Sequence, residues 1–473
     1  MAKTNSEEAL IRDFLANELE ILPDLIENLS AIRADLKSED TRFKTLSATD
    51  GGPTATDLIR RILTKRNLRG LESLHSLELI DTEFELLNTG KGGFQPSADI
   101  LARCAEDSRL FLIEVKQLMQ TEREAVTELS AYSHGLHQRF WNLTSADQIW
   151  MPICTEWRTT VRAAFANQAI WQQRAVLPMS CSVTKNAVGV ISGISLQLLS
   201  LLEAVDEPTA LAQFAWPCFD TITFELSEEP SDPRTLMEFI GSTAARLGFS
   251  GSVLYGESCA GEKFPYPYVY AVAIQNPVSA ALKARQLAIV RDDHERGGPL
   301  EMRKHVKEDV WDWLDLDFAS MEERETPDVL HQIADYLDGS NRALEAREMR
   351  KRADQKFLSV QEMAHASRNR SNVFLDEIKT HLNLFCSFTM GAPSLKHFLT
   401  QSVPVVIDHV SYFGLMQEAV FERLYWEMLH ANGGDGPVIG DVGGGPLSVI
   451  GSPSFFFDFM ALMNFEHDSQ ADQ

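Results

Sequence analysis

The sequence predicts a mixed α/β protein: a mixed sheet flanked by helices over residues 54–190, a second, smaller α/β unit over 200–295, and a mainly helical region over 296–430. Three observations predict this class. The 473 residues are too many for one compact core. Short apolar runs alternate with segments of helical period through residue 295. Glycine-rich breaks separate a helical N-terminal arm, residues 1–50, and a loop with an aromatic tail, residues 431–473, from the rest.

The first 190 residues alternate between the two periodicities. Apolar residues at helical spacing over residues 5–45 predict one or two helices, and the Asp50-Gly-Gly-Pro53 segment ends them. A helix is expected from Thr54 to Leu74. Three strands then follow, at Ile80–Leu87, Asp99–Cys104 and Leu110–Val115, and after them a long helix at Glu122–Trp141. Two more strands, with a helix between them, are expected at Ile149–Cys154 and Val176–Val183.

The second α/β unit rests on a shorter series of the same kind. Its elements are a strand, a helix and two strands, at Thr221–Leu226, Thr235–Leu247, Gly251–Tyr255 and Tyr268–Ile274. Beyond them the charged sequence favours helix, until glycines cluster before the aromatic tail.

Composition restricts the class of protein. A net charge of −25 argues against a chain that coats nucleic acid by bulk electrostatics, but residues 51–190 carry 15 basic and 15 acidic side chains and are neutral. The polar N-terminus lacks a signal core, and no apolar run is long enough for a bilayer. The six cysteines form no Cys-x-x-Cys pair and indicate reduced thiols. We therefore expect a cytoplasmic protein without membrane contact.

The candidate catalytic residues lie on two neighbouring strands. Asp99 begins one of them, and Glu114-Val-Lys116 ends the other. Because strand side chains alternate, Glu114 and Lys116 point to one face. Two carboxylates that meet at one point suit a hard cation such as Mg²⁺, and a lysine beside them can orient water or offset charge on a phosphate.

This arrangement resembles the PD-(D/E)XK, or restriction-endonuclease-like, nuclease superfamily over roughly residues 54–185. The resemblance implies that Asp99 and Glu114 bind Mg²⁺ or Mn²⁺, that Val115 contributes its carbonyl, and that Lys116 is the catalytic lysine. The first motif is Ser-Ala-Asp99 rather than Pro-Asp, with Pro96 displaced upstream.

Further candidates lie on the two helices that flank these strands. Glu128 and Tyr132 share one helix face and are similar to the Gln-x-x-x-Tyr element of the RecB-like branch, with Glu in place of Gln. Glu72 is a candidate for the additional acid that the family often has. It shares a helical stripe with Arg61, Lys65 and Arg69, which are expected either to face a phosphate backbone or to form a solvated face.

Three other motifs give weaker support for a functional site. His365 lies in a segment with a faint similarity to a histidine-kinase phosphoacceptor helix, but no ATP-binding motif follows. His134 and His137 lack the partners of a zinc site. The basic cluster over residues 347–356 is interleaved with acids, which is typical of a salt-bridged helix.

These residues predict a metal-dependent nuclease, with DNA favoured over RNA as substrate and a role in bacterial antiviral defence suggested by analogy. Residues 200–473 are expected to gate it by recognising a ligand, a partner protein or a second copy of the chain. The alternatives are a non-catalytic scaffold that keeps the nuclease fold and a phosphorelay protein that uses His365.

Overall fold

The computed structural model describes residues 7–46, 52–85, 97–116, 122–139, 143, 147–157, 159–170, 174–187, 191–258, 266–276, 280, 283–284, 374–384, 386–391, 395–400, 405–431 and 449–471. The chain forms two compact units. Unit 1 consists of residues 1–210 and 418–441, and unit 2 of residues 211–417 and 442–473.

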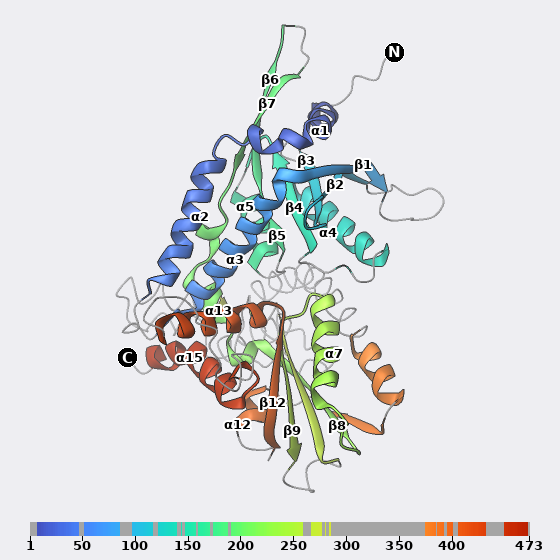
Figure 1. The fold of residues 1–473 in the computed structure, drawn as a ribbon, viewed down its shortest axis with the longest axis vertical. Helices are drawn as coiled ribbons and strands as arrows, with labels where there is room; N and C mark the ends of the chain where they lie inside the picture. Colours follow the sequence, from blue (N-terminus) through green and yellow to red (C-terminus); the bar gives the residue numbers. More distant parts are fainter. Residues whose placement is uncertain are drawn as a thin grey trace, which may run out of the picture. The chain divides into compact units, whose positions relative to one another are not determined.

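Unit 1 is built on one mixed sheet (Figure 1). The sheet has the order β1-β2-β3-β4-β6-β7, with the short β5 paired to β4. Its strands are β1 (Leu77–Glu85), β2 (Ser97–Cys104), β3 (Leu110–Lys116), β4 (Gln148–Cys154), β5 (Ala175–Val176), β6 (Met179–Lys185) and β7 (Ile191–Leu198). The first three strands are antiparallel, β4 is parallel to β3 and to β6, and β7 returns antiparallel to β6.

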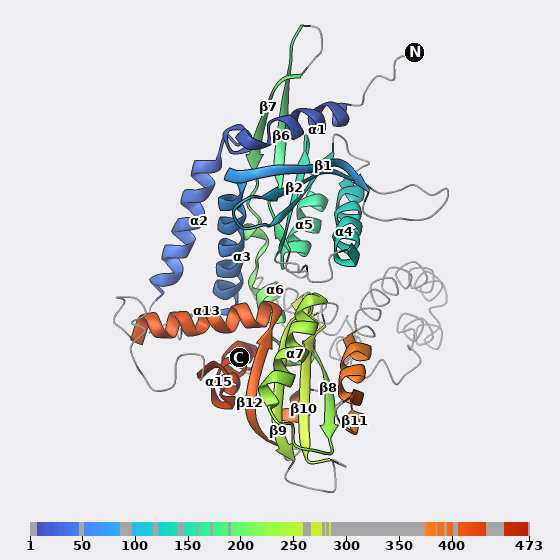
Figure 2. The ribbon, with the colours of Figure 1, turned by 45° about the vertical axis from the view of Figure 1, so that its right-hand side comes forward.

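Helices provide the parallel crossovers and cover the sheet (Figure 2). The helix α4 (Glu122–Arg139) joins β3 to β4, and α5 (Thr159–Ile170) leads from β4 towards β5 and β6. The helix α3 (Ala55–Glu72) begins at a capping box, in which Thr54 and Asp57 satisfy each other's backbone N–H groups, directly after the predicted break. The mixed sheet flanked by helices that the sequence predicted is therefore confirmed.

The N-terminal segment belongs to this unit. It contains α1 (Glu7–Asn17), the 3₁₀ helix η1 (Leu19–Leu25) and α2 (Leu29–Lys44), and α3 ends in a second 3₁₀ turn, η3 (Ser73–Ser76). The α1 residues Ile11 and Leu15 are fully buried, so this segment packs as part of the domain. Part of α13 (Gly414–Ala431), from Glu418 onward, also belongs to unit 1.

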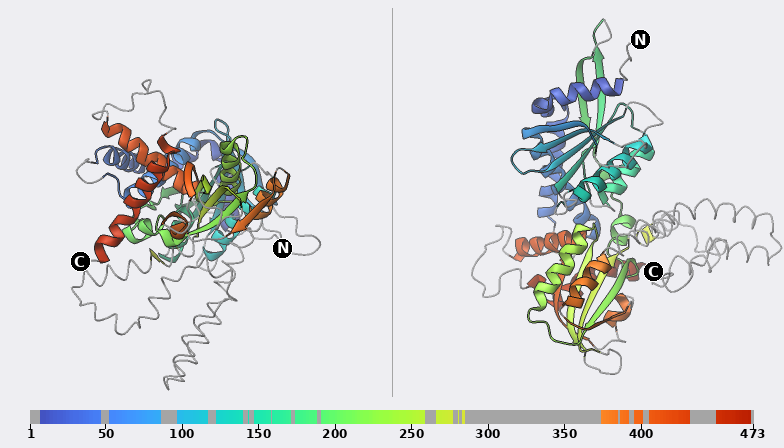
Figure 3. Two further views of the ribbon diagram at one scale, coloured as in Figure 1. Left: turned by 90° about the horizontal axis from the view of Figure 1, so that it is seen from below. Right: turned by 90° about the vertical axis from the view of Figure 1, so that its right-hand side faces the viewer.

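Unit 2 has a five-stranded antiparallel sheet in the order β11-β8-β10-β9-β12. The strands are β8 (Phe219–Leu226), β9 (Gly251–Ser258), β10 (Tyr268–Gln275), β11 (Phe388–Gly391) and β12 (Val405–Phe413). The helix α7 (Pro233–Arg246) and the helix of residues 374–384 accompany the sheet (Figure 3). Among the described elements other than β12, the chain order is β8, α7, β9, β10, the helix of residues 374–384 and β11. These strands lie in the sheet order β11-β8-β10-β9, as in a split βαβ arrangement.

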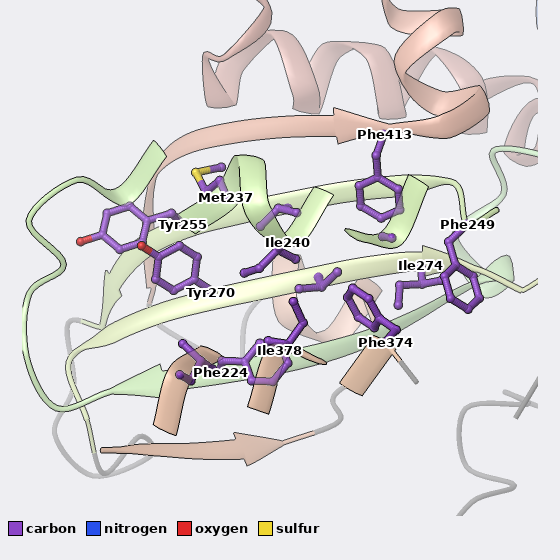
Figure 4. Packing of buried hydrophobic residues seen from close by; sticks show 14 of the residues in the cluster. Phe224, Met237, Ile240, Phe249, Tyr255, Tyr270, Ile274, Phe374, Ile378 and Phe413 are labelled. Atoms are coloured by element: carbon purple, nitrogen blue, oxygen red, sulfur yellow. The ribbon is translucent and has the colours of Figure 1, made fainter. Parts of the chain in front are cut away.

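One apolar core joins these helices to the sheet (Figure 4). It combines side chains from alternate strand positions, such as Tyr270 and Val272, with Met237 and Ile240 of α7 and Phe374 and Ile378 of the later helix. The remaining elements of the chain are η5 (Leu202–Ala204), α6 (Glu207–Ala212), η6 (Trp216–Cys218), α12 (Leu395–Thr400) and α15 (Pro453–Ala471).

The structure differs from the sequence prediction in several places. The strands β11 and β12 come from the region expected to be mainly helical, and they complete the sheet of unit 2. The strand expected at Val176–Val183 is divided by Pro178 into β5 and β6. The aromatic tail is the helix α15. Residues 285–373 lie outside the described residues.

Candidate active site

The two central candidate strands bring Asp99, Glu114 and Lys116 together. In the antiparallel pair of β2 and β3, Ile100 lies opposite Ile113, so the preceding Asp99 and the following Glu114 are neighbours across the ladder. The backbone N–H of Val115 donates a hydrogen bond of 2.8 Å to Asp99 Oδ2. The predicted alternation therefore places both carboxylates at one point of the sheet.

The ammonium group of Lys116 lies among three carboxylates from three different elements. Its Nζ is 2.6 Å from Glu114 Oε1, 2.9 Å from Glu128 Oε2 on α4, and 3.3 Å from Glu8 Oε1 on α1. Lys116 is 7% exposed and Glu114 is 1% exposed. The site is therefore a buried ionic cluster at the end of β3.

Burial raises the pKa values of the two carboxyl groups of the sheet, Asp99 and Glu114. Burial raises the pKa of Asp99 to about 6, although the Val115 N–H and the Lys116 charge both oppose this shift. Burial, together with repulsion from Asp99, raises the pKa of Glu114 well above its usual range. Two carboxyls that resist ionisation side by side are typical of a site that holds a cation or a proton.

The groups around this pair are shifted so that Lys116 and Glu128 stay charged and Tyr132 stays neutral. Burial by itself would lower the pKa of Lys116, but the charge of Glu114 and hydrogen bonds to Glu114 and Glu128 raise it, so the lysine is cationic. Burial would raise the pKa of Glu128, yet hydrogen bonds to Glu114 and Lys116 lower it. Burial and the neighbouring carboxylates raise the pKa of Tyr132, which lies one turn after Glu128.

The donor set fits a hard divalent cation. Glu114 Oε2 is buried, and Glu114 is hydrogen-bonded to the carboxyl group of Glu128, so a proton or a cation is needed between the two acids. Within the described part of the chain, no three Asp, Glu, His or Cys side chains are arranged to hold one metal ion. A magnesium site needs only one or two protein carboxylates, because water and substrate phosphate supply the other oxygens. Asp99 and Glu114 are the residues that would hold it.

Glu128 and Tyr132, which were predicted from the sequence, lie at this cluster, but Glu72 does not. Glu72 is exposed at the end of α3, and no contact joins it to the cluster among the described residues. A carboxylate that the sequence did not single out, Glu8, contacts Lys116 instead. A signal was present, because Glu8 precedes the buried Ile11 and Leu15 by three and seven residues and so shares their helix face.

The predicted basic stripe on α3 is used within the protein. Arg61 is 5% exposed, pairs with Asp40 and lies 3.2 Å from Glu422 of α13. Lys65 pairs with the same Glu422. These two side chains therefore neutralise acids within unit 1, although the Lys65 side chain is still 37% exposed. Arg69 is exposed.

The histidine candidates receive no structural support. His134 and His137 lie on α4, but their side chains are outside the described residues, as are His365 and the basic cluster over residues 347–356.

Comparison with family models, with curated proteins and with solved structures finds no match to this chain. Within the described residues, none of the helices combines the length and the apolar character that a membrane crossing requires.

Proposed function

We propose that unit 1 is a metal-dependent phosphodiesterase of the PD-(D/E)XK type that cleaves nucleic acid, with DNA the favoured substrate. The observation that carries the proposal is the convergence of Asp99, Glu114 and Lys116 at the end of β2 and β3, with Glu128 of α4 beside them. The order α3-β1-β2-β3-α4-β4, with β3 and β4 parallel, agrees with the same proposal.

Each residue has a defined part in this proposal. Asp99 and Glu114 would supply oxygen ligands to a Mg²⁺ or Mn²⁺ ion, and such an ion, when bound, would act as a Lewis acid on the phosphate and on water. Lys116 carries a positive charge that offsets charge on the phosphate oxygens. Glu128 holds the lysine in place, since it pairs with Lys116 at 2.9 Å. Unit 2 and the other C-terminal segments then act as the part that gates cleavage.

A non-catalytic scaffold is the second candidate, and one observation favours it. Lys116 already has three carboxylate partners, so the cluster could serve only to hold α1, β3 and α4 together. The scaffold predicts that divalent cations do not bind to this cluster.

The test compares the wild type with Asp99→Asn, Glu114→Gln and Lys116→Arg, on plasmid DNA and single-stranded RNA, in Mg²⁺, Mn²⁺ or EDTA. The two carboxyl substitutions retain size, and Lys116→Arg retains the charge but replaces the compact ammonium group that lies among three carboxylates. Glu72→Gln is the matched control, because Glu72 is an exposed acid outside the cluster. We expect cleavage by the wild type and the control alone, and none in EDTA. Absence of both cleavage and calorimetric Mn²⁺ binding in the wild type would favour the scaffold.

A further inference from the structure

The helix α1 covers the candidate site. It packs against β3 and β7, and it lies at the end of the sheet from which the β6–β7 hairpin extends (Figures 1 and 2). Ile11 and Leu15 are 0% exposed and hold its inner face, while Glu7 pairs with Lys185 of β6. The helix is therefore docked by one apolar stripe and by ion pairs at its first turn.

Glu8 is the most exposed member of the acidic set around Lys116. Its side chain is 30% exposed, against 21% for Glu128 and 2% for Glu114. It also makes the longest of the three contacts with the lysine, 3.3 Å. The side of the cluster nearest solvent is thus closed by α1, and Lys116 retains only 8% of its side-chain exposure.

Among the described residues, Glu8 contacts the cluster through the ammonium group of Lys116. No group of three acidic side chains in the described chain is arranged around a metal position. A carboxylate oxygen that accepts from a lysine occupies the position in which the same lysine would bind a phosphate oxygen. Glu8 therefore competes with an anionic substrate for Lys116.

We propose that α1 is an autoinhibitory lid and that Glu8 occupies the place of the substrate phosphate at Lys116. This inference rests on the proposed function of unit 1. A phosphodiester reaches the cluster only after α1 has moved away from β3, which breaks the contact of Glu8 with Lys116 and exposes the stripe of Ile11 and Leu15. The lid slows cleavage until this helix is released.

The experiment uses the full chain and two variants that release the lid in different ways. Glu8→Gln removes the charge that competes with phosphate, and Ile11→Ser weakens docking of α1 without a change at the cluster. Glu20→Gln, an exposed acid of η1, is the matched control. The readouts are DNA cleavage in Mn²⁺ and acetylation of Lys116 by acetic anhydride, measured by mass spectrometry.

We expect both release variants to cleave faster than the wild type, by about tenfold for Glu8→Gln, the effect of losing one charge-assisted contact. We expect Ile11→Ser also to raise acetylation of Lys116 severalfold. Slower cleavage by Glu8→Gln would make Glu8 part of the catalytic machinery and overturn the lid, and unchanged cleavage would overturn it as well. If no protein cleaves DNA, the proposed function fails, and the lid is judged by acetylation: unchanged labelling of Lys116 in Ile11→Ser overturns it.

Discussion

Replacement of Asp99 by Asn is expected to stabilise the metal-free protein while it destroys the candidate metal site. Burial raises the pKa of Asp99 from 3.8 to about 6. A shift of this size corresponds to about 3 kcal/mol at 1.36 kcal/mol for each pKa unit. The free energy of unfolding of the metal-free wild type is therefore lower by about this amount when Asp99 is ionised.

The pH dependence follows from the direction of the shift. The folded state binds the Asp99 proton more tightly than the unfolded state does. The contribution of this proton to the free energy of unfolding is therefore complete below about pH 4, and it is lost as the pH rises through about 6. The asparagine that replaces Asp99 would be neutral throughout, and its side-chain oxygen can still accept the Val115 N–H. The free energy of unfolding of Asp99→Asn should thus exceed that of the metal-free wild type by about 3 kcal/mol at pH 8 and by about half of that near pH 5.

Urea unfolding in EDTA at pH 8 and pH 5 measures this difference, with Glu72→Gln as the control. Added Mn²⁺ should stabilise the wild type and leave Asp99→Asn unchanged, because a ligand stabilises only the state that binds it. A variant that is less stable than the wild type at pH 8 in EDTA would refute the reasoning, since Asp99 would then be a structural acid.

Two further predictions concern the packing of the two units, one in each unit. Glu422→Gln should lower the free energy of unfolding by about 3 kcal/mol, because it removes a partner of the buried Arg61. Glu418→Gln should cost less than about 1 kcal/mol, because the Glu418 side chain is 44% exposed in its pair with Arg66. Equal losses in urea unfolding would contradict the buried pair. Gly251→Ala should lower the free energy of unfolding by about 3 kcal/mol or more, because an added Cβ would lie 1.8 Å from a backbone oxygen. Gly193→Ala should lower it only slightly, because an added Cβ there meets nothing within 4 Å. A stable Gly251→Ala protein would show that β9 can shift against β10.

Much of unit 1 could be predicted because its elements carry local signals. The periodicity of apolar residues located α3, β2, β3 and α4 within a few residues, and the capping residue Thr54 marks the start of α3. The strand β12 could not be found in this way. It lies far along the chain from its partner β9, and such a pairing depends on contacts that no short window contains.

The sequence by itself determined that Glu114 and Lys116 share a face, because their spacing of two residues is the period of a strand. It also determined that Glu128 and Tyr132 share a helix face. Only the tertiary structure decided that Glu8 approaches Lys116 from a segment more than 100 residues away, and that Arg61 is committed to Asp40 and Glu422. The physical reason is the same in each case: local spacing orients a side chain, whereas its charge partners and its burial, which shift its pKa, come from elements that are remote in sequence.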